Sequence, residues 1–561
     1  MESIIVDTRD RISQLPESII HHILSYLYSP KDLVRMSILS TYWFGITASF
    51  PILIFNFSRF KEVLKSSGIP YDTKKDISDT FFKYVKYTVS RFYEQNVSVH
   101  TFNLNTSSLD PTEVDIINRC LEMTIKKGVK VLVININYWA HLSSHPHQRY
   151  CVPNILLTAT SLTSLTLSNC VLPLSLMVDV KFKCLKLLCL SWITLNDEVI
   201  KRLTTSCPLL EELAVIYCVG LKRFCVHGLL YLQKVQIQCR REVERIEIDA
   251  PNLCYICLSD SDDTDDKEAP PSMNLASCKK LTKVCYHGIG LPGMLSNFPF
   301  IEDLFLHLPD ECERLNMSNH SLRTFMLDSK CEFDKIDVDT PNLQLFGFTD
   351  DSCNYSRMKT NQAPSKACIK WDCDVFINDH WFQELRQFLD KKTRFKELKL
   401  HINVGCVEPI EREVIQWPPI EFEHVELEAK EFEIVKFYLR VVNGLLWCCR
   451  PQSLTLIIDF SLLKFEEWES VVKKTYEKLL QQEDQAHTNI QFLMSSSSSK
   501  AKMNFSDLST LLKALPRDGS KQTITFVKNK SCSRSRKRKP SKVSESISED
   551  ESIADKDLGF L

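Results

Sequence analysis

Residues 10–44, DRISQLPESIIHHILSYLYSPKDLVRMSILSTYWF, decide how the N-terminal part of this chain folds. Pro16 suits a first helical turn, because its missing N–H would have no helical partner there. Apolar residues recur after it at helical spacing, and residues 29–30, Ser-Pro, end that helix and open a second one. An aromatic triplet follows at 42–44. So short a segment has too little volume to bury all these side chains within itself. The rest of the chain or another protein must therefore cover some of them.

This segment resembles the F-box. The family pattern is D-R-I-S, then L-P, then an apolar helix ending in I-L-S-x-L, followed by K-D-L/A-V-R, S-x-L-S and a Trp. The chain matches it in order at Asp10, Arg11, Ile12, Ser13, Leu15, Pro16, Ile23, Leu24, Ser25, Leu27, Lys31, Asp32, Val34, Arg35, Ser37, Leu39, Ser40 and Trp43. It departs from the pattern at Thr41-Tyr42, where the family commonly has two basic residues. This difference concerns a peripheral charged contact and not the apolar part of the match. The alternative interpretation of residues 10–44 is an ordinary N-terminal helical hairpin with no relation to the F-box.

The resemblance implies a three-helix F-box over residues 8–56 that docks a Skp-family adaptor and, through it, a cullin. A few buried anchors usually dominate such an interface. The expected adaptor contacts are the apolar positions Leu15, Pro16, Ile19, Ile23, Leu24, Leu27, Val34, Leu39 and Trp43.

A second pattern, apolar-x-x-apolar-x-apolar, recurs along most of the chain. Its copies begin at Val99, Val129, Leu162, Leu185, Leu210, Leu232, Leu253, Leu281, Ile301, Leu322, Leu343, Phe395 and Phe422. From Leu162 to Leu343 the starts lie 23, 25, 22, 21, 28, 20, 21 and 21 residues apart, which is the period of a leucine-rich repeat. Alternate strand residues point the same way, so the last two apolar positions of each copy face one side. One copy cannot cover that face, and stacking the copies buries a continuous core.

We therefore expect an α/β fold: a helical F-box, then a leucine-rich-repeat solenoid with a curved parallel sheet and helical or irregular returns over 78–430. Residues 78–93 form an apolar stripe at helical spacing with lysines opposite, which favours a packed helix over a nucleic-acid-binding segment. The longest interval contains an acidic, proline-rich insertion, 259–272, expected as an exposed loop rather than a calcium site. A C-terminal cap region, 431–527, includes a Ser-rich linker at Ser495–Ser499.

Composition restricts the function classes. The net charge of −2 gives no global attraction to nucleic acid or membrane, and no apolar run is long enough to span a bilayer. The 22 cysteines lie at irregular spacings, often in strand-like runs, which is typical of free thiols in a reducing compartment. The N-terminal residues lack the features of a secretory signal. We expect the protein in the nucleus, the cytoplasm or both.

Candidate chemistry is weak. His141, His145, His147 and Cys151 could ligate a metal, but no second cluster has zinc-finger spacing and a loop between repeats explains them equally well. With only 13 glycines the chain shows no phosphate-binding loop, and it has no kinase or hydrolase motif. We therefore expect no metal, no cofactor and no catalytic residues, and nothing in the sequence supports an enzymatic function.

Residues 528–561 are expected to be a disordered tail, because they hold a basic run followed by an acidic, serine-rich run and have little apolar surface to bury. The basic run has the composition that nuclear-import receptors read. Its residues are Arg534, Arg536, Lys537, Arg538 and Lys539.

The two resemblances together imply the non-catalytic substrate receptor of an SCF-type, cullin–RING ubiquitin ligase, in which the repeats bind a target protein. The runner-up is an interaction scaffold that does not lead to degradation. Solenoids present their strand residues on one extended surface. The expected target contacts are polar positions within the strands: Thr163, Lys186, Glu211, Asp303 and Arg323. The sequence names neither the target nor the process controlled, nor whether a small molecule is needed.

Overall fold

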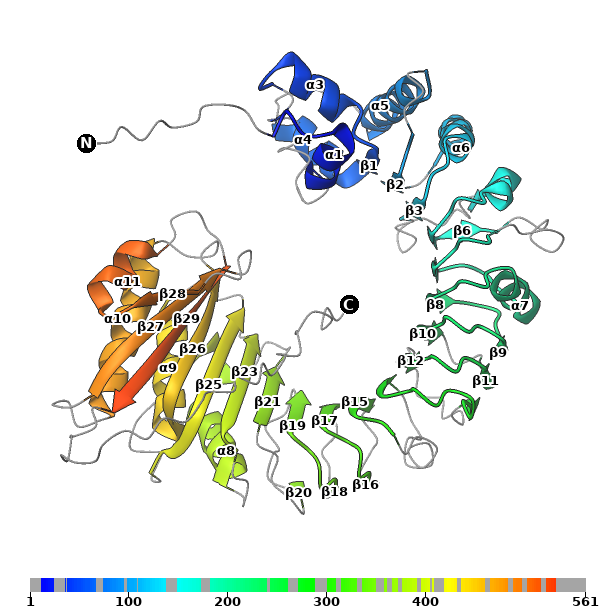
Figure 1. Ribbon diagram of the computed structural model, residues 1–561. Coiled ribbons are helices and arrows are strands. Elements are labelled where there is room, and N and C mark those ends of the chain that lie inside the picture. The colour runs from blue at the N-terminus through cyan, green and yellow to red at the C-terminus, as the bar shows by residue number, and fades with distance from the viewer. Residues whose placement is uncertain are drawn as a thin grey trace, which may run out of the picture.

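The computed structural model shows a small helical module followed by a long curved sheet, which together form an open arc (Figure 1). Strands line the inner side of the arc and helices or short strands return along its outer side. The structure describes residues 12–24, 36, 38–66, 74–94, 98–107, 109–137, 149–172, 182–239, 243–260, 271–287, 300–308, 314–329, 335–349, 358–360, 366–371, 376–390, 395–403, 406–407, 418–430, 435–459, 465–482, 488–496, 502–515 and 521–530.

The N-terminal module contains the short helices α1 (Glu17–Leu24) and α3 (Thr41–Ala48). Ser40 caps α3, because its Oγ accepts a hydrogen bond from the Trp43 N–H at 3.1 Å. Strand β1 (Ile52–Asn56) and helix α4 (Phe57–Ser66) follow directly. Because β1 pairs in parallel with the first repeat strand, the module is joined to the solenoid by backbone hydrogen bonds.

The inner sheet is parallel over most of its length, and neighbouring strands are consecutive repeats. Its order begins with β1 and follows the chain. The next strands are β2 (Thr101–Thr106), β3 (Val131–Ile136), β5 (Ser164–Ser168), β7 (Leu187–Ser191), β8 (Glu212–Cys218), β10 (Lys234–Cys239), β12 (Tyr255–Asp260), β14 (Lys283–His287), β15 (Asp303–Leu308), β17 (Thr324–Ser329), β19 (Leu345–Thr349), β21 (Lys366–Trp371), β23 (Glu397–Asn403), β25 (Ile420–Lys430) and β26 (Cys449–Asp459).

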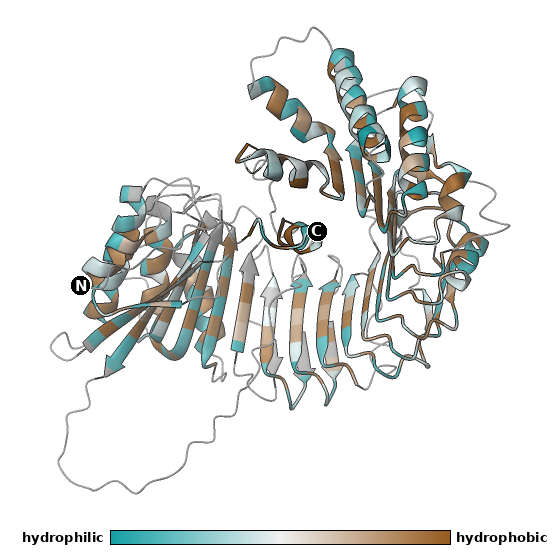
Figure 2. Cartoon of the chain, turned by 45° about the horizontal axis from the view of Figure 1, so that its top comes forward, coloured by the Kyte–Doolittle hydropathy of each residue, from teal (hydrophilic) through white to brown (hydrophobic). Residues whose placement is uncertain are grey.

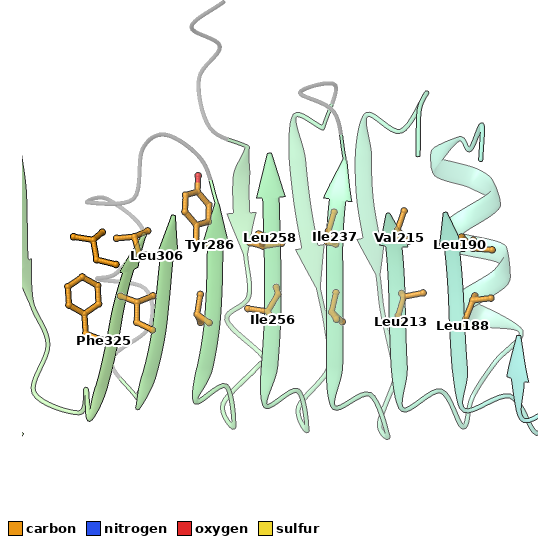
Figure 3. Close-up of a cluster of buried hydrophobic side chains, with 14 of the residues drawn as sticks. Leu188, Leu190, Leu213, Val215, Ile237, Ile256, Leu258, Tyr286, Leu306 and Phe325 are labelled. Carbon is orange, nitrogen blue, oxygen red and sulfur yellow. The ribbon is translucent and has the colours of Figure 1, made fainter. Parts of the chain in front are cut away.

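Two rows of apolar side chains run across these strands and form the core. Leu188 is in register with Leu213, and Leu190 with Val215, and the rows continue through Ile256 and Leu258 and beyond (Figure 3). The residues between them are less buried, because successive strand residues point to opposite faces. Bands of differing hydropathy are visible along the strands in Figure 2. One continuous core extends from the first strand to the last. Burying one such Leu contributes about 1.5–3 kcal/mol, so the stacked repeats stabilise one another.

Returns on the outer side change from helices to short strands along the chain. The first returns are α5 (Lys74–Glu94), α6 (Pro111–Lys126), the 3₁₀ helix η1 (Asn154–Thr158) and α7 (Asp197–Thr205). Short parallel strands form small outer sheets: β4 (Tyr150–Cys151) with β6 (Cys170–Val171); β9 (Arg223–Val226), β11 (Arg245–Ile248) and β13 (Ser272–Asn274); β16 (Arg314–Ser318), β18 (Lys335–Asp339) and β20 (Met358–Thr360); β22 (Phe376–Ile377) with β24 (Cys406–Val407).

The C-terminal end of the sheet turns antiparallel. Strand β26 pairs with β29 (Lys521–Lys530), which pairs with β27 (Thr488–Ser496), which pairs with β28 (Lys502–Phe505). Helices α8 (Asp379–Asp390), α9 (Val435–Cys448) and α10 (Phe465–Gln481) lie along one face of this part, and α11 (Leu508–Ala514) follows β28 (Figure 1). The antiparallel strands end the repeat series with a different architecture.

The expected fold class is confirmed: helices at the N-terminus precede a long parallel sheet with a repeat at each strand. The ends of the elements differ in detail from the expected ranges. Strand β1 lies inside the range expected for the F-box, Ser495 and Ser496 lie in β27, and Lys528 continues β29 beyond the expected start of the tail. The shifts at β27 and β29 have the same cause, since strand pairing extends order into residues whose composition suggested a linker or tail.

The helix expected at 78–93 is α5, whose buried face is the predicted stripe, with Phe81, Phe82, Val85 and Val89 all at most 1% exposed. Most of the acidic insertion and all of the tail from residue 531 lie outside the described residues. Within the part of the chain that the structure describes, no helix is both long enough and apolar enough to cross a bilayer.

Candidate interaction surfaces

The N-terminal module has a small core of its own. Ile20 and Leu24 of α1 pack with Trp43, Ile46 and Phe50, and all are at most 7% exposed. The His21 ring meets Phe50 edge-on at 5.7 Å, and its Nε2 lies 3.1 Å from the Ile46 carbonyl oxygen. These contacts fix α1 against α3.

A second set of apolar side chains in the module is exposed. Ile19 and Ile23 lie one residue before Ile20 and Leu24, so they project from the neighbouring face of α1 and are 46% and 42% exposed. Leu39, just before α3, is 66% exposed. Such a concentration of exposed apolar surface on a small module is typical of a protein-interaction site.

Of the expected adaptor contacts, Leu15, Pro16, Ile19, Ile23 and Leu39 are exposed, whereas Leu24 and Trp43 are buried in the module core. Leu27 and Val34 lie outside the described residues. Sequence reasoning left out four exposed apolar side chains of this surface. They are Ile12, Ile38, Tyr42 and Phe44, at 50%, 79%, 42% and 59% exposure. The aromatic pair could have been found, because both residues flank a tryptophan that occupies the core.

The inner face of the solenoid presents the first, third and fifth residues of each strand from β2 to β23 in three parallel rows, which His424, Glu426 and Glu428 continue in β25. In β7 these are Leu187, Cys189 and Ser191, and Ser191 is in register with Ile216 of β8. The rows keep this alignment from β2 to β25. We call them the first, third and fifth rows.

The five expected target contacts fall in two different places. Thr163, Lys186, Glu211 and Arg323 each directly precede a strand and form a column linked by backbone hydrogen bonds, whereas Asp303 opens β15 in the first row. Lys186 Nζ lies 2.7 Å from Glu211 Oε1, and Asp303 Oδ2 lies 3.1 Å from Lys283 Nζ. Three of the five side chains are therefore already ion-paired within the inner face or at its margin.

Titratable groups gather in the middle of the fifth row. Ser259 Oγ lies 3.1 Å from His287 Nδ1, the His287 and His307 rings are 3.7 Å apart, and His307 Nδ1 lies 2.9 Å from Asp328 Oδ2. These four groups form a continuous polar chain across four strands. It makes the centre of the inner face a hydrogen-bonding surface.

Ion pairs dominate the next strands. Lys366 pairs with Glu397 at 2.9 Å, and His401 Nδ1 lies 2.8 Å from Glu428 Oε2. Burial lowers the pKa of the His401 imidazole, but hydrogen bonds to Cys368 and Glu428 outweigh burial and raise that pKa to about 9. His401 is therefore an imidazolium at neutral pH.

An aromatic pair with a strained backbone lies at the ends of β7 and β8. Trp192 and Tyr217 have φ angles of 57° and 51°, and their rings stack 4.6 Å apart at 27°. Bulky residues rarely adopt this left-handed conformation, which costs roughly 1–2 kcal/mol for each. Gln238 Nε2 donates to Tyr217 Oη at 3.0 Å, while Gln238 Oε1 is buried without a partner among the described residues. Sequence reasoning missed this pair, because spacing patterns carry no φ information.

Metal-ligating groups are sparse in the part of the chain that the structure describes. One set, Asp79, Asp110 and Glu113, brings its carboxylates within 4.8 Å of one another. Local hydrogen bonds account for it, because Asp110 and Glu113 form the capping box of α6 and Ser78 donates to Glu113. His141, His145 and His147 lie outside the described residues, and Cys151 is an exposed free thiol.

Comparison with protein families finds two matches that correspond to the two parts of the structure. An F-box-like family matches residues 12–56, and the family of leucine-rich repeats of the FBD-associated F-box protein At5g56370 matches residues 117–292. Neither match is to a catalytic domain. The chain thus combines an F-box-like module with a leucine-rich-repeat solenoid, and the resemblance seen in the sequence is confirmed.

Curated relatives from Arabidopsis thaliana have the same combination in their names. The chain is 27% identical to F-box/LRR-repeat protein 25 over 45% of this chain and 87% of that protein. It is 29% identical to F-box/LRR-repeat protein At5g02910, over 38% of this chain and 40% of the relative. With the putative F-box/LRR-repeat protein At3g18150 it shares 27% identity over 53% and 59%. The chain thus aligns with most of the first relative but with only 40–59% of the other two.

Proposed function

We propose that this protein is the substrate-recognition subunit of an SCF-type, cullin–RING ubiquitin ligase. The F-box-like module docks a Skp-family adaptor, and through it a cullin, while the solenoid holds a target protein. The observation that carries the proposal is the set of exposed apolar side chains on a module whose own core is already filled. A surface of that kind needs a partner, and the F-box resemblance names its class.

The role is positional rather than chemical. Holding a target close to a ubiquitin-carrying enzyme raises the effective concentration of the target's lysines, so this chain needs no catalytic group of its own. We place target binding on the inner face, near Thr163, Lys186, Glu211, Asp303 and Arg323. The hydrogen-bonding and ion-paired rows support that placement, because solenoids use their extended inner surfaces for binding.

Co-purification with a recombinant Skp-family adaptor tests the proposal. The wild-type chain should form a stable complex. The double substitution Leu15→Ala with Pro16→Ala should weaken it by roughly 1–4 kcal/mol, the range of interface hot spots. Both residues are exposed in the module, so the loss should come from the contact and not from unfolding.

Leu230→Ala is the matched control, because Leu230 is 59% exposed but lies in the solenoid. It should bind the adaptor like the wild type. If the wild-type chain forms no complex with the adaptor, the ligase role fails and a non-degradative scaffold takes its place. Equal complex formation by the double variant would move the contact to Ile38, Tyr42 and Phe44, which are also exposed.

A further inference from the structure

We infer that the stacked pair Trp192 and Tyr217 is a docking platform for an extended, uncharged, proline-containing segment of a protein partner. The inference rests on the proposed function in one respect: the partner is the target that the solenoid holds. Three features of the described residues carry it. They are the exposure of the pair, the chemistry of the rows beside it, and the backbone conformation that holds it.

The pair presents an aromatic surface with a hydrogen-bond donor beside it. Trp192 is 45% exposed although it is among the largest apolar side chains of the protein, and its ring stacks on Tyr217. Tyr217 Oη accepts from Gln238, so its own hydroxyl hydrogen remains to donate to a carbonyl oxygen. A flat face next to a donor suits a ligand that offers a ring and a carbonyl together.

The inner face beside the platform carries no formal charge in its third and fifth rows. From β2 to β10 the third row is Asn103, Val133, Thr166, Cys189, Ala214 and Gln236, and the fifth is Asn105, Asn135, Ser168, Ser191, Ile216 and Gln238. The first row of this half does hold charges, at Glu212 and Lys234. From β15 to β25 the third and fifth rows themselves hold ion-paired groups, namely His307 with Asp328, Lys399 with Glu426 and His401 with Glu428. A partner at the N-terminal half is therefore recognised by stacking and hydrogen bonds, and its segment is uncharged.

Proline satisfies these requirements better than other residues. Its ring packs flat on aromatic faces, and the polyproline II conformation leaves the backbone carbonyls free of internal hydrogen bonds. The amides and hydroxyls of the fifth row then offer further donors along the extended segment. The same platform could in principle stack against a sugar ring, so the experiment includes that class of ligand.

The backbone indicates that the pair is held for a purpose other than stability. The equivalent position of the preceding repeat is Asn169, also left-handed at φ 57°, and asparagine tolerates this conformation. Trp192 does not, yet its N–H is held in place by a 2.9 Å hydrogen bond to the Ile216 carbonyl. Strained positions of this kind cluster at binding sites. A glycine here would relieve the strain and remove the platform.

Fluorescence anisotropy with the full-length protein provides the test. The probe is a labelled, uncharged peptide with proline at two of every three positions, and the comparison probes are its alanine counterpart and a chitin hexasaccharide. The variants are Trp192→Gly, which removes the ring, and Tyr217→Phe, which keeps the stack but removes the hydroxyl. Tyr231→Ala is the control, because Tyr231 is an exposed aromatic of the adjoining repeat.

We expect the proline peptide to bind the wild-type protein and the Tyr231→Ala control equally. Binding should weaken about tenfold or more in Trp192→Gly and about threefold to tenfold in Tyr217→Phe. Trp192→Gly should melt at the same temperature as the wild type or higher, a result that a purely structural role for Trp192 would not give.

Three results would overturn the inference: no binding of the proline peptide by the wild type, equal binding by Trp192→Gly, or binding of the hexasaccharide alone. Every variant is also captured with the Skp-family adaptor. If a variant loses peptide binding but still binds the adaptor, the result tests the platform alone. If the wild type fails to bind the adaptor, the result counts against the proposed function and not against the platform.

Discussion

At the scale of single residues, the N-terminal module separates side chains that build it from side chains that it offers to a partner. Leu24 is 1% exposed and Leu39 is 66% exposed, although both occupy apolar positions of the same F-box pattern. Leu24→Ala should lower the free energy of unfolding of the module by about 2–5 kcal/mol, because it leaves a cavity between α1 and α3. Leu39→Ala should change it by less than about 0.5 kcal/mol.

Hydrogen exchange of peptides from residues 12–56 measures this difference within the intact chain. The amides of α1 and α3 should lose protection in Leu24→Ala and keep it in Leu39→Ala. Adaptor capture should fall in both variants. In Leu24→Ala the module loses its fold, whereas in Leu39→Ala a folded module loses a contact with the adaptor. Lost protection in Leu39→Ala would mean that Leu39 belongs to the module core, and the proposed contact surface would shrink accordingly.

Sequence reasoning located these residues but could not sort them. Helical spacing placed Ile19, Ile20, Ile23 and Leu24 on one stripe, and the structure divides that stripe between two faces. The position of α3 decides which face of α1 is covered. That packing is a tertiary contact, and local periodicity in the sequence does not predict it. Trp43 shows the same limit, since its place in the module core does not follow from local spacing.

At the scale of secondary-structure elements, close helix packing in the C-terminal part depends on one glycine. Gly444 lies in α9, and a Cβ added there would overlap the ring of Phe382 in α8, a side chain with no exposed surface. Gly444→Ala should therefore destabilise this part by about 1–3 kcal/mol, even though alanine favours helix more than glycine does. Asn443→Ala, one residue earlier in the same helix, is the control.

A double-mutant cycle identifies the cause. Phe382→Leu removes the ring that the new methyl group would strike, so Gly444→Ala should cost less in that background, with a coupling energy of roughly 0.5–3 kcal/mol. Thermal unfolding followed by circular dichroism gives the four values. Additive effects of the two substitutions would show that steric overlap between α8 and α9 is not what Gly444 avoids.

Elements with strong periodicity followed from the sequence, and weak ones did not. Helix α5 and most inner strands, from β2 to β19 and then β23 and β25, were predicted, because their apolar residues repeat at about 3.6 or at two positions. The inner strands β1 and β21 were not. The outer strands, such as β9 and β18, were not, since four or five residues carry too little pattern to distinguish a strand from a loop. They form because stacking places equivalent segments side by side, so their cause lies in the neighbouring repeats.

At the scale of the whole molecule, the arc divides its inner face by chemistry. In the N-terminal half, from β2 to β10, the third and fifth rows carry no formal charge. They adjoin a central polar chain of Ser259, His287, His307 and Asp328, and an ion-paired part follows. The two ends of the surface therefore bind a partner by different interactions. One partner can be bound by aromatic stacking in the N-terminal half and by charge complementarity in the ion-paired part. The period of the repeats predicted the solenoid, but the zoning depends on which residues come into register, and uneven repeat lengths hide that alignment.

The last prediction concerns where the whole chain resides, and it rests on the sequence beyond the described residues. We propose that the basic run Arg534, Arg536, Lys537, Arg538 and Lys539 directs import into the nucleus, because import receptors read dense basic patches in extended segments. Replacing residues 536–539 with alanines in a fluorescent fusion should shift the signal from nucleus to cytoplasm. The control replaces Lys83 and Lys86, two exposed lysines of α5, with alanines. The nuclear signal should then stay unchanged, since a folded helix offers no extended basic run.

The acidic stretch beside that run provides a second arm of the same test. Ser546, Ser548 and Ser552 each have an acidic residue three positions on, and phosphate there would add negative charge next to the basic run. Aspartates at the three serines should therefore reduce nuclear signal, while alanines should preserve it. Unchanged nuclear signal after loss of the basic run would leave the tail a solubilising or RNA-contacting segment, and the protein would then meet its targets wherever the adaptor complex carries it.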